Sequence, residues 1–338
     1  METGVDKKIL LAHGSGGRLS HDMVEKNVVP SLANPILDRL DDSAVFDLSG
    51  RVAFTTDSYV VNPIFFPGGD IGKLAVCGTI NDLAMSGASP LYLSLSLIIE
   101  EGLPLAELDK IINSIQGVIK ETDLKVVTGD TKVVNQGSAD KLFINTAGIG
   151  LVPPGVNVSG ANARPGDKVI LSGAIGDHGI AVMAQREGLR LKIPVESDCA
   201  PLDSLVADML SYSSAINCLR DPTRGGLATT LNELAAQSKV GINIEEAEIP
   251  VHQSVSAACE ILGLDPLYVA NEGKLVAIVA PEQAGEILSV MKQNRYGKES
   301  TIIGEVVSER PGRVIMKTLL GASRIVDMIS GELLPRIW

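Results

Sequence analysis

Apolar and β-branched residues gather in two successive sets of short segments along the chain. In the first set, this pattern predicts strands at residues 52–56, 91–99, 125–128 and 142–150. Apolar residues at helical spacing predict a helix over residues 105–121, and residues 71–86 are a second helix candidate. This order predicts two helices packed on one face of a mostly antiparallel sheet.

Residues 152–166 are dense in proline, glycine and asparagine and predict a linker. Beyond it, strands are predicted at residues 168–172, 242–245, 275–279 and 301–307. Helices are predicted at residues 179–187, 202–216, 226–238, 254–262 and 282–293. We therefore expect an α+β protein with two domains, residues 1–155 and 165–330, followed by an extended tail over residues 331–338.

Composition and charge narrow the class of protein. A length of 338 residues suits two domains, and 45% apolar with 21% charged residues is typical of soluble globular proteins. The net charge of −12 opposes binding to nucleic acid, which is a polyanion. No signal peptide and no apolar run of membrane-spanning length is present, so we expect a cytoplasmic protein without a membrane partner. The four cysteines form no CxxC pair, which argues against a zinc site or a disulfide framework.

Carboxylates recur beside turn residues at the ends of predicted elements: Asp41, Asp42, Asp57, Asp82 and Asp130. Such positions can converge at one end of a sheet, where unpaired carboxylates would repel one another. A convergent cluster would therefore need divalent cations, and Mg²⁺ bridging phosphates suits these oxygen ligands. The alternative is that each aspartate is a separate cap or turn residue.

Two glycine-containing segments of the first half can bind phosphate. Residues 13–17, His-Gly-Ser-Gly-Gly, can wrap phosphates with backbone amides, although a mobile end segment is the alternative. In residues 127–134, Gly129 permits a sharp turn off a strand, Asp130 can hold metal, and Lys132 adds a charge or base. A conventional P-loop is not predicted at residues 67–74, because Pro67 and Leu74 replace the required glycine and hydroxyl residue.

Three segments of the second half offer further polar groups. Residues 221–226, Asp-Pro-Thr-Arg-Gly-Gly, lead into a helix and predict an anion pocket, with a turn and helix cap as the alternative. Residues 176–179, Gly-Asp-His-Gly, open another helix, although a lone histidine such as His178 is more often structural. Glu272 precedes a strand, where a surface turn is the default interpretation.

Together these segments resemble the ATP-binding superfamily of aminoimidazole ribonucleotide synthetase, selenophosphate synthetase and thiamine-monophosphate kinase, over essentially the whole chain. Residues 65–70, 128–134, 176–180 and 221–226 resemble more specifically the HypE family of hydrogenase maturation factors. The resemblance implies an N-terminal α/β domain that dimerises through its sheet, a C-terminal α+β domain, and ATP with Mg²⁺ bound between them.

The HypE family dehydrates a carbamoyl group, carried on its own terminal cysteine, to a thiocyanate. The resemblance implies HypF as carbamoyl donor and the HypC–HypD complex as cyanide acceptor, with a homodimer as the active form. Lys132 and Glu272 match the family's proposed proton-handling positions. The implied metal ligands are Asp41, Asp42, Asp57, Asp82 and Asp130. The implied cofactor-binding residues are His13, Gly14, Gly16, Gly17, Asn81, Thr131, Asp177, His178, Asp221, Thr223 and Arg224.

The last residue departs from the family pattern, since the family ends Pro-Arg-Ile-Cys and this chain has Trp338 at the carrier position. An indole cannot form the thiocarbamate adduct, so we expect ATP binding but no carbamoylation at the tail. By this interpretation, the protein is a dehydratase that lacks the cysteine on which the carbamoyl group would be carried. The alternatives are a small-molecule kinase or ATP-dependent synthetase of the same superfamily, and a non-catalytic nucleotide-binding scaffold.

Overall fold

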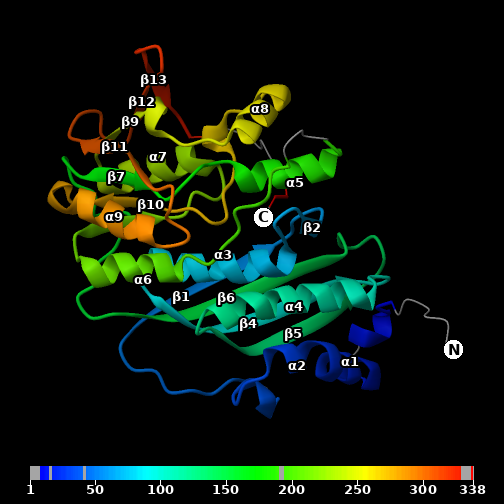
Figure 1. The fold of residues 1–338 in the computed structure, drawn as a ribbon. Coiled ribbons are helices and arrows are strands. Elements are labelled where there is room, and N and C mark those ends of the chain that lie inside the picture. Colours follow the sequence, from blue (N-terminus) through cyan, green and yellow to red (C-terminus); the bar gives the residue numbers. More distant parts are fainter. Residues whose placement is uncertain (1–7, 15–16, 41–42, 190–193, 329–335, 338) are drawn as a thin grey trace.

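The two predicted sets of elements form two separate sheets in the computed structural model (Figure 1), which describes residues 8–14, 17–40, 43–189, 194–328 and 336–337. The predicted α+β architecture is confirmed. The first sheet has the order β1 (Arg51–Tyr59), β6 (Leu142–Val152), β4 (Ser89–Glu100), β5 (Lys125–Val134). Its pairs are antiparallel except β4 and β5, which are parallel because α4 (Leu105–Glu121) crosses over between them.

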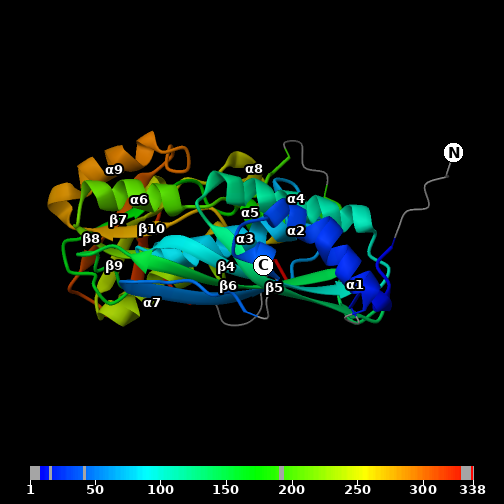
Figure 2. The same cartoon turned by 90° about the horizontal axis from the view of Figure 1, so that it is seen from below.

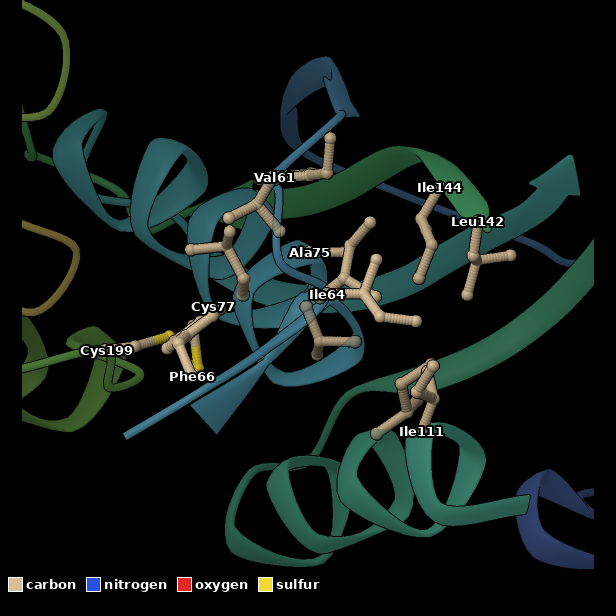
Figure 3. Packing of buried hydrophobic residues seen from close by; sticks show 14 of the residues in the cluster. Val61, Ile64, Phe66, Ala75, Cys77, Ile111, Leu142, Ile144 and Cys199 are labelled. Carbon is tan, nitrogen blue, oxygen red and sulfur yellow. The ribbon is translucent and has the colours of Figure 1, made fainter. Parts of the chain in front are cut away.

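Helices α3 (Ile71–Met85) and α4 cover one face of this sheet, as Figure 2 shows from below. The carboxylate of Asp70 caps α3 by accepting hydrogen bonds from the amides of Gly72, at 2.8 Å, and Lys73, at 3.0 Å. α4 buries one apolar stripe that includes Ile111, and Ile111 packs in one cluster with Ile144 of β6 (Figure 3). α3 is buried on nearly all sides because it also contacts the second half of the chain.

The second sheet has seven strands in the order β13, β12, β9, β11, β7, β10, β8. Their bounds are β7 (Lys168–Leu171), β8 (Ile216–Arg220), β9 (Gly241–Glu245), β10 (Val276–Val279), β11 (Thr301–Val307), β12 (Val314–Lys317) and β13 (Ser323–Val326). The helices are α5 (Asp177–Glu187), α6 (Asp203–Tyr212), α7 (Gly226–Ser238), α8 (Gln253–Leu262) and α9 (Ala284–Gln293). Alternate residues of β10 face opposite cores: Ile278 packs with α7, whereas Ala277 packs with α6 and α9. This sheet is therefore covered on both faces.

Two sequence predictions about elements are wrong. The helix predicted over residues 202–216 ends at Tyr212, because Ser213 adopts an extended backbone and Ile216–Arg220 pairs with β10 as strand β8. The turn predicted at Gly129 is absent, because β5 continues through it to Val134. A Cβ atom at position 129 would lie 2.2 Å from the Leu95 carbonyl oxygen, so glycine at this position allows β5 and β4 to lie close together.

Several short elements carried no sequence prediction. They are α1 (Arg18–Met23), α2 (Val29–Leu32), the hairpin of β2 (Phe65–Phe66) and β3 (Gly69–Asp70), β12 and β13. The two short helices lie beside α4 and β5 (Figure 1). Across the described ranges, no helix has both the length and the apolar character needed to cross a bilayer.

The contact between α3 and α4 yields a stability prediction for two helix glycines. A Cβ atom at Gly72 would lie 2.7 Å from Cγ2 and 2.9 Å from the carbonyl oxygen of Ile111, whereas one at Gly117 would meet nothing within 4 Å. We expect Gly72→Ala to lower the free energy of unfolding by about 1–3 kcal/mol through overpacking. Gly117→Ala, the matched control, should raise it by up to about 1 kcal/mol. Urea unfolding measures both, and equal effects would contradict the predicted close packing.

Candidate active site

An acidic cavity of about 140 Å³ lies where α3 and β1 meet the second half of the chain. It is lined by Asp57, Ser58, Tyr59, Gly78, Asp82, Asp221, Thr223, Arg224 and Glu272. We call this space the acidic pocket. Six of these residues were sequence candidates, and they come from two distant parts of the chain.

Asp57 of β1 and Asp82 of α3 are neighbours in the acidic pocket. The Thr55 hydroxyl donates to Asp82 Oδ2 at 2.7 Å, and the Tyr59 hydroxyl donates to Asp57 Oδ2 at 3.2 Å. The guanidinium of Arg224 approaches Asp57 Oδ1 at 4.0 Å. Burial, with the nearby charge of Asp57, raises the pKa of Asp82 to about 6.

Two carboxyl groups from the second half of the chain complete the cluster. Burial, followed by repulsion from Asp82, raises the pKa of Asp221 to about 7. Glu272 is only 4% exposed, and burial raises its pKa well above its usual range, with Cys199 and Asp221 adding to the effect. The raised pKa values follow first from burial and then from the mutual proximity of the acidic groups.

The donor set of the acidic pocket fits a hard cation that also binds phosphate. Within the described residues, no three His, Cys, Asp or Glu side chains form a metal-binding group of their own. Asp57 and Asp82 form a pair of oxygen donors, and Mg²⁺ in proteins commonly takes one or two carboxylates and completes its shell with phosphates and water. The residues present therefore suit Mg²⁺ delivered with a nucleotide.

The backbone around Glu272 is held by Asp198, a buried carboxylate. Asp198 accepts hydrogen bonds from the amides of Glu272, at 3.1 Å, and Gly273, at 3.3 Å, and from Lys274 Nζ at 3.1 Å. Burial alone would raise the pKa of Asp198, but the ammonium of Lys274 and these hydrogen bonds outweigh it and lower that pKa. Asp198 therefore stays ionised and fixes the position of Glu272.

Asn81, predicted to bind cofactor, is fully buried and bonded to backbone groups. Its Nδ2 donates to the carbonyls of Ala200, at 3.1 Å, and Glu272, at 3.2 Å, and its Oδ1 accepts from the Leu202 amide at 2.8 Å. The side chain thus joins α3 to the segments that surround Glu272, and its cofactor role stays a prediction.

Asp130, Thr131 and Lys132 do not join the acidic pocket. They line a separate cavity of about 370 Å³, together with Gly14 and the short N-terminal helices. Lys132 Nζ donates to Asp130 Oδ1 at 2.7 Å, and this bond lowers the pKa of Asp130.

Strand register explains the separation of Asp57 from Asp130. Asp57 pairs with Thr146, whose hydroxyl is 2.6 Å from that of Thr79 in α3, so Asp57 lies on the helix-covered face. Asp130 pairs with Ser96, which pairs with Asn145, the neighbour of Thr146 along β6. Because side chains alternate along a strand, Asp130 lies on the opposite face. The two edge strands β1 and β5 are also three strand spacings, about 14 Å, apart.

Of the remaining candidates, Gly14 lines the larger cavity, His13 and Gly17 lie near it in sequence, and four others lie outside the described residues. His13 accepts a hydrogen bond from the Leu10 amide through Nδ1 at 2.9 Å, and Gly17 precedes α1. The backbone of Gly14 lies against Val133 of β5. Gly16, Asp41, Asp42 and Trp338 lie outside the described residues.

Asp177 and His178 lie away from the acidic pocket, in contacts of their own. Asp177 Oδ1 is 2.9 Å from His252 Nδ1, and this bond raises the pKa of His252. His178 is 0% exposed, and its ring nitrogens contact Ser197 Oγ at 2.8 Å and the Ile337 carbonyl oxygen at 2.9 Å. The polar atoms of Asp177 and His178 thus have hydrogen-bond partners within the protein, and a role of either residue in cofactor binding stays a prediction.

Among the residues that sequence reasoning missed are Tyr59, which lines the acidic pocket, and Asp198, which holds the backbone of Glu272. Tyr59 fills the space left by Gly78, where a Cβ atom would lie 2.2 Å from the tyrosine hydroxyl. The strand was predicted to end at residue 56, whereas β1 continues to Tyr59, so that Tyr59, two positions after Asp57, shares its face. Asp198 gave no local signal, since its partners Glu272 and Lys274 are more than seventy positions away.

Comparison with known proteins identifies the family. The family model for the AIR synthase related protein, N-terminal domain, matches residues 40–152, and that for the C-terminal domain matches residues 164–317. The carbamoyl dehydratase HypE of Azotobacter vinelandii is 54% identical over 328 residues, covering 97% of this chain and 96% of that protein.

The solved structures that resemble this chain belong to the same family. HypE in complex with ATP is 48% identical and superposes with a TM-score of 0.95, covering 97% of this chain and 99% of that one. HypE from a HypE–HypF complex is also 48% identical, with a TM-score of 0.81 and coverage of 93% and 100%. With this similarity over nearly the whole length, the chain belongs to the HypE family of carbamoyl dehydratases.

Proposed function

We propose that this protein provides the ATP-dependent machinery that dehydrates a carbamoyl group, carried as a thioester on a terminal cysteine, to a thiocyanate for hydrogenase cyanide ligands; this chain has Trp338 at the position of that cysteine and is itself carrier-deficient. The observation that carries the proposal is the acidic pocket, where Asp57, Asp82, Asp221 and the buried Glu272 meet Arg224. An excess of carboxyl groups beside an arginine suits a nucleotide triphosphate that brings its own cation. HypE in complex with ATP, the relative with a TM-score of 0.95, supports the nucleotide.

The reaction balances as carbamoyl thioester plus ATP giving thiocyanate, ADP and phosphate. The amide oxygen attacks the γ-phosphorus and ADP departs, which turns the oxygen into a phosphate leaving group. Removal of the nitrogen protons then forms the carbon–nitrogen triple bond as phosphate leaves. Mg²⁺, held by Asp57 and Asp82, would neutralise charge on the phosphate oxygens when bound.

Glu272 is the base that we propose for the nitrogen protons. Its burial makes its carboxylate more basic than an exposed one, and Asp198 fixes its backbone. Arg224 would orient the phosphates as a donor with fixed charge.

Partners follow from the family. We propose HypF as carbamoyl donor, which the HypE–HypF complex of a relative supports, and the HypC–HypD complex as cyanide acceptor, in the cytoplasm. We also propose a homodimer through the first sheet, because Phe54, which is 68% exposed, Val52 and Ile98 leave apolar surface on the face away from the helices. Lys132 lies on this same face, so we propose that it reaches an acidic pocket only across the dimer, in the partner subunit.

The first prediction tests the missing carrier. Trp338 offers no thiol, so the chain incubated with HypF, carbamoyl phosphate and ATP should gain no carbamoyl adduct at its tail. Trp338→Cys should gain ATP-dependent thiocyanate formation. Mass spectrometry of the tail peptide measures both. An adduct on the tail of the unaltered chain, or ATP binding by Trp338→Cys without any thiocyanate, would contradict the proposal.

The second prediction concerns Glu272 and is made in the Trp338→Cys chain. A base must be ionised to accept a proton, and the pKa of Glu272 is raised, so the rate of thiocyanate formation should fall as the pH decreases. Glu272→Gln should lower kcat at least about 100-fold and abolish that pH dependence. Glu305→Gln, at a surface ion pair with Lys168, is the control and should leave the profile unchanged. A full rate in Glu272→Gln would remove Glu272 from the mechanism.

The third prediction tests Lys132 across the proposed dimer. In the Trp338→Cys chain, Lys132→Ala and Glu272→Gln should each be inactive alone. Mixed in equal amounts and allowed to exchange subunits, they should regain about a quarter of the activity, because half the dimers are mixed and each has one intact site. No regained activity despite proven subunit exchange would show that Lys132 acts within its own chain or not at all.

A further inference from the structure

The face of strand β1 that lies against helix α3 is polar at three successive positions. Side chains alternate along a strand, so Thr55, Asp57 and Tyr59 share the helix-covered face of β1. A strand face under a helix ordinarily carries apolar side chains, because burial of a polar group is costly unless that group is hydrogen-bonded. The hydroxyls of Thr55 and Tyr59 meet this condition by bonding to the two aspartates of the acidic pocket.

Each of these two carboxyl groups receives one hydroxyl. Thr55 donates to Asp82 Oδ2 at 2.7 Å, and Tyr59 donates to Asp57 Oδ2 at 3.2 Å. Each bond occupies one carboxyl oxygen and leaves the other, Oδ1, to face a cation. The guanidinium of Arg224 approaches Asp57 Oδ1 only to 4.0 Å, which is too long for a hydrogen bond.

Both hydroxyl donors are held rigidly. Thr55 is β-branched, which restricts rotation about its χ1 angle. Tyr59 is 4% exposed and belongs to the apolar cluster that includes Leu74 and Ile80 of α3. A Cβ atom at Gly78 would lie 2.2 Å from the Tyr59 hydroxyl oxygen. The interior of α3 therefore carries a residue of low helix propensity at the position where the hydroxyl needs space.

The strand that presents the two hydroxyls is fixed as well. β1 pairs with β6 in one continuous register from Arg51 to Tyr59. The Asn145 side chain of β6 adds a further bond, since its Nδ2 donates to the backbone carbonyl of Asp57 at 2.8 Å. The hydroxyls and the carboxyl groups thus have little freedom to turn relative to one another.

Such an arrangement distinguishes between divalent cations. Mg²⁺ requires a near-ideal octahedral shell and binds through one or two carboxylates, completed by phosphates and water. Ca²⁺ takes about six to eight oxygens in a flexible shell and accepts a carboxylate through both of its oxygens. A carboxyl group whose Oδ2 is bonded to a fixed hydroxyl offers a single oxygen, which suits Mg²⁺ and disfavours Ca²⁺.

We propose that Thr55 and Tyr59 determine the cation specificity of the acidic pocket, because their hydroxyls hold Asp82 and Asp57 in the single-oxygen orientation that selects Mg²⁺ over Ca²⁺. Both are positioning residues, since they act on the carboxyl groups and not on the nucleotide or the reacting atoms. This inference rests on the proposed function, in which Asp57 and Asp82 hold the cation of the nucleotide, and it adds what discriminates between cations.

The test measures binding and not turnover. A non-hydrolysable ATP analogue is titrated into the unaltered chain by calorimetry, in saturating Mg²⁺, in saturating Ca²⁺ and in EDTA. The specificity is the dissociation constant in Ca²⁺ divided by that in Mg²⁺. Thr55→Val and Tyr59→Phe should each lower this ratio, and the double variant should lower it at least about tenfold, because hydrogen bonds that orient a metal ligand typically contribute about 10- to 100-fold in affinity.

Two control variants separate the hydroxyls from packing. Thr55→Ser keeps the hydroxyl and loses a methyl group, so it should keep the ratio that Thr55→Val loses. Tyr268→Phe removes a hydroxyl that donates to the Asp327 carbonyl at 2.9 Å and does not line the acidic pocket, so it should leave the ratio unchanged. Equal losses in Thr55→Ser and Thr55→Val would show an effect of packing and would overturn the assignment of Thr55.

A further variant separates this inference from the proposed function. Asp57→Asn should weaken binding of the analogue in Mg²⁺ at least about tenfold, toward its value in EDTA, because a ligand of the cation is lost. If the unaltered chain binds the analogue equally in Mg²⁺ and in EDTA, the proposed function fails and this inference fails with it. If binding depends on Mg²⁺ and on Asp57, but the double variant of Thr55 and Tyr59 keeps the ratio, this inference alone is overturned.

Discussion

The loop of residues 194–202 and its buried carboxylate, Asp198, hold together the parts that meet at the candidate site. Asp198 can remain ionised in the interior because Lys274 and two backbone amides compensate its charge. The loop approaches its neighbours so closely that side chains are excluded: a Cβ atom at Gly273 would lie 1.8 Å from the Asp198 carbonyl oxygen, and one at Gly68 would lie 2.7 Å from the Ser197 amide nitrogen. The position of Glu272 depends on this loop.

The same loop separates two kinds of polar environment. On one side, in the acidic pocket, burial raises the pKa of Asp82, Asp221 and Glu272, and neighbouring acidic groups add to the effect. On the other side, His178 has a lowered pKa because it is buried, and as a neutral ring it can donate to Ile337 while accepting from Ser197. The loop thus contacts both the backbone of Glu272 in the acidic pocket and the histidine that contacts the Ile337 carbonyl.

Sequence patterns located most of the regular structure and six of the nine residues that line the acidic pocket. The strands of the first sheet followed from their apolar and β-branched content, and helix α4 followed from the periodicity of its one buried face, because both patterns are local. Helix α6 was predicted too long. The segment that follows it is apolar, and it forms strand β8, not a further helical turn, because it pairs with β10. Asp57 and Asp82 were expected together and lie together, but Asp130 was expected with them and lies elsewhere.

The sequence by itself determined the family, the α+β class and most of the polar residues that line the acidic pocket, because motifs and periodicity are properties of neighbouring positions. Only the tertiary structure decided which of them meet. Strand register put Asp57 and Asp130 on opposite faces of one sheet, and long-range contacts assigned Asn81 to the junction of the two halves and His178 to the tail. A one-residue change of register reverses the face of a side chain, and nothing in the local sequence of a single strand specifies its partner.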